Sequence, residues 1–272
     1  MRLRFLSFGL LSLMATVCTG QVVLKKDDKF KKTTTMDMQI TTHVMGEPMD
    51  IANKTTTYES VLVKDANAEG FTMEHTINRL VAEAQIAGQT MIYDTDDKNA
   101  TDIQSTLLKA KVAEKYTIQT TKEGLIKNVS GSSDLNPGEL NKVTQGAYYE
   151  LVFPAGKDIN SLKVGDALTD TLKDDESTTI RNYKVTEAAA GKDICLSVQG
   201  KTTMKGKMPM MGGVEGNMAL SGTLKGKSYY SRNTGVLTKS SLTVNMSGTM
   251  EQAGQETPIA MKMVSTNELK KD

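Results

Sequence analysis

Apolar and polar residues alternate with a period of two along most of this chain, and this alternation limits its possible folds more than any other feature. In the first long stretch, Met36, Met38 and Ile40 share one parity, and polar residues occupy the other. Segments 71–77 and 242–250 repeat the pattern. Successive side chains of a strand point to opposite faces of a sheet, and the abundant β-branched Thr suits a pleated surface. The alternation therefore predicts a mainly β protein made of half-buried strands.

Turn-forming residues separate the alternating runs. Gly46 with Pro48, Gly88, and Gly254 with Pro258 each lie between two such runs. Glycine at these places can take positive φ, and proline fixes its own φ. The regular succession of strand and turn predicts antiparallel meander sheets.

Two segments depart from this rhythm. Residues 101–113 place Ile103, Leu107 and Val112 at helical spacing, and Pro137 opens a second segment with the composition of a helix start. We therefore expect one or two short helices in the connecting regions.

The strand rhythm lapses near the middle of the chain, and the order of elements on either side is similar. The strand, turn and strand of residues 57–77 have a counterpart at 179–198. This similarity indicates either an ancient duplication or only the likeness that hairpins of any meander share. The predicted organisation is an N-terminal antiparallel β half at 21–131, a connecting segment at 132–162 and a C-terminal antiparallel β half at 163–272.

The N-terminus has the features of a secretory signal peptide. A short basic start precedes an apolar run at 5–17 that is too short to span a bilayer comfortably. Small residues at Cys18 and Gly20 predict a signal peptide of residues 1–20 with cleavage before Gln21. Lipidation at Cys18 is the weaker alternative, because the preceding Val17 is bulkier than such a site prefers.

The charge balance excludes several classes of partner. The chain has 33 Lys and Arg against 32 Asp and Glu. Nucleic-acid binding needs clustered positive charge, so we predict no nucleic-acid partner. We also expect no transmembrane span after signal cleavage, because the one long apolar run belongs to the signal. The mature chain would keep only Cys195, which excludes a disulfide framework.

The inventory of catalytic groups is small. The chain has two histidines and no nucleophile elbow, zinc-binding helix, Cys-x-x-Cys pair or phosphate loop. His75 falls on the apolar parity of its strand, which predicts a hydrogen-bonded core residue, whereas His43 falls on the polar parity and should face solvent. Two glycosidase-type carboxylates from distant strands stay open as a weaker alternative, because no tryptophan is present to stack a sugar. We predict a non-enzymatic protein without a cofactor.

Methionine is the most unusual residue choice. Of 17 methionines, 15 remain when Met1 and Met14 of the signal are left out, and these cluster along the chain. Thioether side chains are flexible and polarisable, so a sheet face rich in them can adapt to apolar ligands of variable shape. The expected partner is a hydrophobic small molecule or lipid, or an envelope protein. The predicted ligand-facing residues are Met36, Met38, Met73, Met246, Met250, Met261 and Met263.

Two alternatives to this hypothesis stay open. Thioethers are soft ligands that prefer Cu(I), so the same residue type also indicates a copper-handling or oxidant-buffering protein. The third interpretation is a purely structural interaction module, which would have a filled core and no concavity. The candidate metal ligands in the copper interpretation are His43, Met45, Met49, Met208, Met210 and Met211.

Several local sequences together carry a resemblance to a known family. They are the Tyr58–Glu74 strand pair, Tyr93-Asp94-Thr95-Asp96-Asp97, the helix before Tyr116-Thr117-Ile118, Lys122-Glu123-Gly124, Lys163-Val164-Gly165-Asp166 and Thr234-Gly235-Val236-Leu237. With these segments the chain resembles an uncharacterised family of exported proteins from Bacteroidota-type bacteria. The resemblance implies a β-rich fold and a Gram-negative envelope setting, either periplasmic or associated with the outer membrane, and it carries no catalytic residues. The sequence departs from the family at Ala167-Leu168, where Ser-Trp is common.

Overall fold

The fold is taken from a computed structural model of the chain. It describes residues 24–44, 47–86, 89–122, 126–131, 159–173, 177–188, 193–209, 215–252 and 254–272. The predicted signal peptide at 1–20, the predicted helix near Pro137 and most of the predicted connecting segment lie outside these ranges. No helix among the described residues is long and apolar enough to cross a bilayer.

Within the ranges just given, the first half of the chain contributes six strands and one helix. These are β1 (Lys29–Val44), β2 (Glu47–Asn67), β3 (Gly70–Ile86), β4 (Gln89–Asp94), α1 (Ile103–Lys111), β5 (Lys115–Thr120) and β6 (Ile126–Gly131). The second half contributes a short 3-10 helix, η1, and six more strands. These are η1 (Ile159–Ser161), β7 (Ala167–Lys173), β8 (Ser177–Glu187), β9 (Ile194–Pro209), β10 (Glu215–Tyr230), β11 (Leu237–Gln252) and β12 (Gln255–Lys271).

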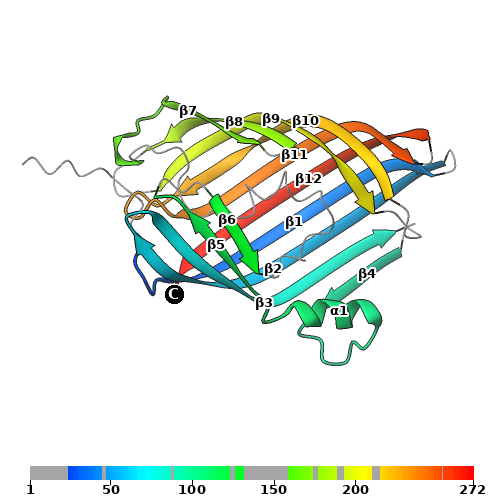
Figure 1. Cartoon of the computed structure of the whole chain (residues 1–272), viewed down its shortest axis with the longest axis horizontal. Coiled ribbons are helices and arrows are strands. Elements are labelled where there is room, and N and C mark those ends of the chain that lie inside the picture. The colour runs from blue at the N-terminus through cyan, green and yellow to red at the C-terminus, as the bar shows by residue number, and fades with distance from the viewer. Residues whose placement is uncertain are drawn as a thin grey trace, which may run out of the picture.

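All twelve strands belong to one antiparallel sheet, which is strongly curved (Figure 1). The strand order is β6-β5-β3-β2-β1-β12-β11-β10-β9-β8-β7, with β4 also pairing with β3. Among the described residues, 76% are in strands and α1 is the single α-helix, so the predicted mainly β meander is confirmed. The helix predicted at 101–113 is present in a shorter form, because Asp102 caps its start with a 2.9 Å bond from the Ser105 amide and Val112 is already extended.

The two ends of the chain join the two halves of the sheet. Strand β1 pairs with β12 from Phe30↔Lys271 to Thr41↔Ala260. The N-terminal strands therefore lie on one side of this seam and the C-terminal strands on the other, in one continuous sheet. The meander is interrupted at β3, which pairs with β5 through residues 71–76 and with β4 through residues 81–86.

The alternation predicted from the sequence becomes a buried inner face and a polar outer face. In β12, residues 259, 261, 263, 265, 267 and 269 are all buried, and the residues between them are exposed or half-buried. We call the buried side, which also carries Ile40, Val61 and Leu196, the inner face. An antiparallel sheet with one solvated side shows this pattern.

A β-bulge keeps one long strand in phase with the inner face. The register shifts where Tyr58 pairs with Arg79 and Glu59 pairs with Ile77, which leaves Asn78 as an extra residue of β3. Without this bulge the apolar residues after Ile77 would point to the solvent side. With the bulge, both Ile77 and Leu80 are buried.

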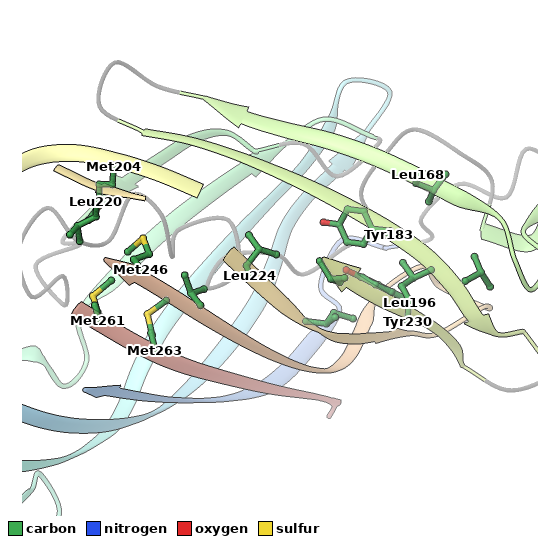
Figure 2. Packing of buried hydrophobic residues seen from close by; sticks show 14 of the residues in the cluster. Leu168, Tyr183, Leu196, Met204, Leu220, Leu224, Tyr230, Met246, Met261 and Met263 are labelled. Atoms are coloured by element: carbon green, nitrogen blue, oxygen red, sulfur yellow. The ribbon is translucent and has the colours of Figure 1, made fainter. Parts of the chain in front are cut away.

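The inner face carries two groups of packed apolar side chains. The larger group spans β7 to β12 with the η1 segment and Ile40 of β1, and its methionines include Met246, Met261 and Met263, which Figure 2 labels. The smaller group lies mainly over β2, β3 and β5, where it contains Met73, and it also includes Phe30 of β1 and Leu269 of β12. The predicted core methionines therefore belong to the sheet interior.

Candidate functional site: a methionine-lined inner face with a buried polar row

The seven predicted ligand-facing methionines all lie on the inner face, but in two groups of different exposure. Met73, Met246, Met250, Met261 and Met263 are buried, and Met36 and Met38 are only half-buried. Cross-strand pairing places Met38 opposite Met263 and Met246 opposite Met261. Figure 2 shows Met246, Met261 and Met263 on the same side of their ribbons. Met73 is separate from them, in the smaller core group.

The inner face is only partly covered along the middle of β1 and β2. Met36, Met38, Ile51 and Leu242 are partly buried apolar residues that pack against the larger core group. Their remaining exposed area marks the part of the inner face that an apolar molecule could reach. Leu242 of β11 and Met36 of β1 both pair with Ser265 of β12, so these two residues flank the same position of the strand between them.

A row of small polar residues crosses the inner face next to this region. Direct cross-strand pairing aligns its members over five neighbouring strands, and all are buried. The Thr34 hydroxyl donates to Asn267 Oδ1 at 2.8 Å, and Asn267 Nδ2 donates to Ser240 Oγ at 3.1 Å. A buried polar group destabilises the fold unless it is hydrogen-bonded. These hydrogen bonds offset that cost for Thr34, Asn267 and Ser240. The polar row consists of Thr57, Thr34, Asn267, Ser240 and Ser228.

A buried ionisable cluster lies beside the polar row. Glu59 accepts hydrogen bonds through both oxygens: Tyr116 OH lies 2.7 Å from Oε1, and His75 Nδ1 lies 3.3 Å from Oε2. The Lys32 ammonium is also 3.3 Å from Oε2. The His75 and Tyr116 rings stack with centroids 4.6 Å apart. Lys32, Glu59 and His75 are each 1% exposed or less, so the sheet holds an ion pair in its interior.

The protonation states of this cluster follow from its contacts. Burial would raise the pKa of Glu59, but the Lys32 ammonium and the hydrogen bonds from His75 and Tyr116 lower it to about 2. Burial lowers the pKa of His75 despite the neighbouring carboxylate. Burial also lowers the pKa of Lys32, and the Glu59 charge opposes that shift. Ionised Glu59 and its counter-ion Lys32 cancel, and His75 is neutral, so the cluster has no net charge near pH 7.

Sequence reasoning placed His75 correctly in the core but missed its partners. His75 is fully buried and His43 is exposed, as their parities predicted. Lys32 and Glu59 were not singled out. Their signal was available, because each falls on the apolar parity of its strand, between Phe30 and Thr34 or between Thr57 and Val61.

The residues of the copper interpretation are only partly described. Met45, Met210 and Met211, and the side chain of Met208, lie outside the described part of the chain. Pairing of His43 with Pro48 and of Thr42 with Met49 puts His43 and Met49 on opposite faces of the β1–β2 hairpin, so the structure does not bring these two together. Within the described ranges, no group of three or more His, Cys, Asp and Glu side chains could hold a metal ion.

A cavity of about 610 Å³ lies at the β1–β2 end of the sheet. Most of its lining residues, including Gln39, Thr41, Asp50 and Gln85, have the parity of the outer face. Thr41 and Asp50 are hydrogen-bonded to each other there at 2.7 Å. The cavity is therefore mainly a polar depression, and Ile40, Met49 and Ile51 of the inner face also line it.

Part of the chain matches a known protein family. The profile of a family of unknown function (DUF6263) matches residues 68–147. This range runs from the β2–β3 turn past β6, and it includes His75 and Tyr116. The match agrees with the resemblance to an uncharacterised family. No protein of curated function matches the sequence.

Comparison with solved structures shows a fold relationship. A structure of lipovitellin, described in terms of its lipid–protein interactions, matches with a TM-score of 0.50 and 9% identity over 90% of this chain. The match takes in 25% of the lipovitellin chain, so this protein spans about a quarter of its relative. An outer membrane channel from Pseudomonas putida F1 covers 92% of this chain and 98% of its own at a TM-score of 0.24 and 7% identity, which is too low to carry an argument.

Proposed function

We propose that this is an exported, non-enzymatic protein of the bacterial envelope that binds a hydrophobic, lipid-like ligand on its inner face. The observation that supports the proposal is the continuous methionine-bearing surface of β11, β12 and β1, part of which is still exposed at Met36 and Met38. Flexible thioethers make such a surface adaptable to chains of different shape. Export rests on the signal-like N-terminus of the sequence.

The fold relationship agrees with this proposal. Lipovitellin carries a similar sheet and its structure is described through its contacts with lipid. At 9% identity the likeness extends to the fold alone. The proposed class of ligand is therefore inferred from the inner face of this chain.

The proposal can be tested by titrating the mature protein with the neutral apolar fluorophore N-phenyl-1-naphthylamine. Replacing both half-buried residues, Met36→Gln with Met38→Gln, keeps side-chain length but makes the exposed part of the face polar. We expect the dissociation constant to rise by roughly tenfold, since burying apolar area contributes about 25 cal/mol per Å².

Ile180→Gln is the control. Ile180 is 42% exposed on the outer face of β8, and its replacement should leave the dissociation constant unchanged. Absence of fluorophore binding by the wild-type protein would favour the purely structural module, whose inner face is filled by its own side chains.

A further inference from the structure

Among the described residues, two buried hydroxyl groups of the inner face have no hydrogen-bond partner, that of Thr120 on β5 and that of Ser265 on β12. Ser265 is 2% exposed, and its Oγ is bonded to none of the described residues. A buried hydroxyl without a partner costs about 1–3 kcal/mol relative to a satisfied one. Alanine would fill this position on the pleated face without that cost, so packing alone does not account for the serine.

The position of Ser265 joins the apolar surface to the polar row. Its cross-strand neighbours are Met36 and Leu242, which are both half-buried. The next inner-face residue of β12 in one direction is Met263, and in the other direction it is Asn267 of the polar row. An unsatisfied hydroxyl therefore lies at the boundary between a reachable apolar surface and a line of hydroxyl and amide groups.

Building on the function proposed above, we propose that Ser265 and the adjacent polar row bind the uncharged polar end of an amphiphile, such as a hydroxyl, while its hydrocarbon chain lies along Met36, Met38 and Met263. The hydroxyl of Ser265 can both donate and accept one hydrogen bond, which matches an alcohol.

The charges near this boundary favour a neutral end group over a carboxylate. Thr34 of the polar row is the inner-face neighbour of Lys32 on β1, and the Lys32 ammonium is already 3.3 Å from Glu59 Oε2. The pair is compensated, so an additional carboxylate on this face would be buried without its own counter-ion. Burying an unpaired charge costs far more than burying a hydrogen-bonded alcohol.

Competition against bound N-phenyl-1-naphthylamine tests this inference with two ligands of equal chain length, 1-dodecanol and dodecanoate. The wild-type protein should bind dodecanol more tightly than dodecanoate. The Ser265→Ala variant should bind dodecanol roughly threefold to tenfold more weakly, the range that loss of one hydrogen bond gives. Its affinity for the fluorophore, which has no hydroxyl, should stay the same.

Ser247→Ala is the matched control, because Ser247 is exposed on the outer face of β11 and its loss should change neither affinity. Tighter binding of dodecanoate, or an unchanged dodecanol affinity in Ser265→Ala, overturns the inference while leaving the proposed function in place. If the wild-type protein binds neither the fluorophore nor either dodecyl ligand, the proposed function fails and the inference fails with it.

Discussion

At the scale of single residues, the buried Lys32–Glu59 pair is the least expected feature of the sheet. Charged residues are seldom fully buried without a partner, and here each supplies the other's counter-charge. Tyr116 and His75 complete the hydrogen bonding of the carboxylate. Removing one member of the cluster should therefore lower the free energy of unfolding by more than the intact ion pair adds to it.

Glu59→Gln should lower the free energy of unfolding by about 3–5 kcal/mol, because it leaves the Lys32 ammonium buried without an anion. Adding Lys32→Met to this variant should restore much of the loss. Asp272→Asn is the control, since it breaks the exposed Lys31–Asp272 pair and should cost less than about 1 kcal/mol. Urea unfolding measures all three, and equal losses in Glu59→Gln and the control would contradict the buried ion pair.

The stability of the protein should also depend on pH through His75. Burial lowers the pKa of His75 from its ordinary 6.5, so below that pH the unfolded chain takes up a proton that the folded chain does not. The free energy of unfolding should fall with decreasing pH by up to about 1.4 kcal/mol per pH unit. Glu59 affects the stability in a lower pH range. Its stabilisation is present above pH 4.5 and is lost as the pH falls toward its folded pKa of about 2.

Urea unfolding between about pH 7.5 and about pH 5.5 measures this slope. His75→Gln, which cannot titrate, should flatten it. His43→Gln removes the other, exposed histidine and should leave the slope as in the wild-type protein. If His43→Gln flattens the slope and His75→Gln does not, the buried cluster is not the source of the pH dependence.

At the scale of the strands, small and large inner-face residues complement each other across β9, β10 and β11. Glycines pair directly with large apolar residues of the neighbouring strand, which leaves room for those side chains on a curved sheet. A Cβ at Gly222 would lie 1.9 Å from the Asn245 carbonyl oxygen, so the backbone would have to move. The pairs are Gly200–Leu224, Gly222–Met246, Gly226–Leu242 and Gly248–Leu220.

Gly222→Ala should therefore destabilise the protein by at least about 1–3 kcal/mol, the usual cost of forcing extra atoms into a packed region. Ser221→Ala changes the neighbouring residue on the exposed outer face and should stay within about 0.5 kcal/mol of the wild-type protein. The urea midpoint distinguishes them, and equal midpoints would mean that the inner face of β10 tolerates an added methyl group.

At the scale of the whole molecule, the sequence predicted which side of the sheet each side chain occupies better than it predicted which strands pair. Period-two alternation alone placed Met261, Met263 and Met246 on a buried face, because parity is a local property of a strand. The pairing of β1 with β12 joins residues more than 200 positions apart, and no local signal specifies it. The Asn78 bulge and the Lys32–Glu59 contact depend on register between strands, which is fixed only when the sheet forms.

The exposed apolar residues of the molecule provide a competing location for a hydrophobic ligand. Ile92 of β4 and Ile103 and Leu107 of α1 are 56–77% exposed, beyond the methionine-lined inner face. Strand β4 and α1 lie together at one side of the sheet (Figure 1). Any test of ligand binding must therefore report where the ligand lies as well as whether it binds.

Photo-crosslinking with a dodecyl probe that carries a diazirine in its hydrocarbon chain, followed by peptide mass spectrometry, reports this location directly. Binding on the inner face predicts labelled peptides from the middle of β1 and from β11 and β12, around Met36, Met38 and Leu242, with labelling reduced by unlabelled dodecanol. Labelling concentrated on β4 and α1, or labelling that dodecanol does not reduce, would contradict a ligand site on the methionine-lined face.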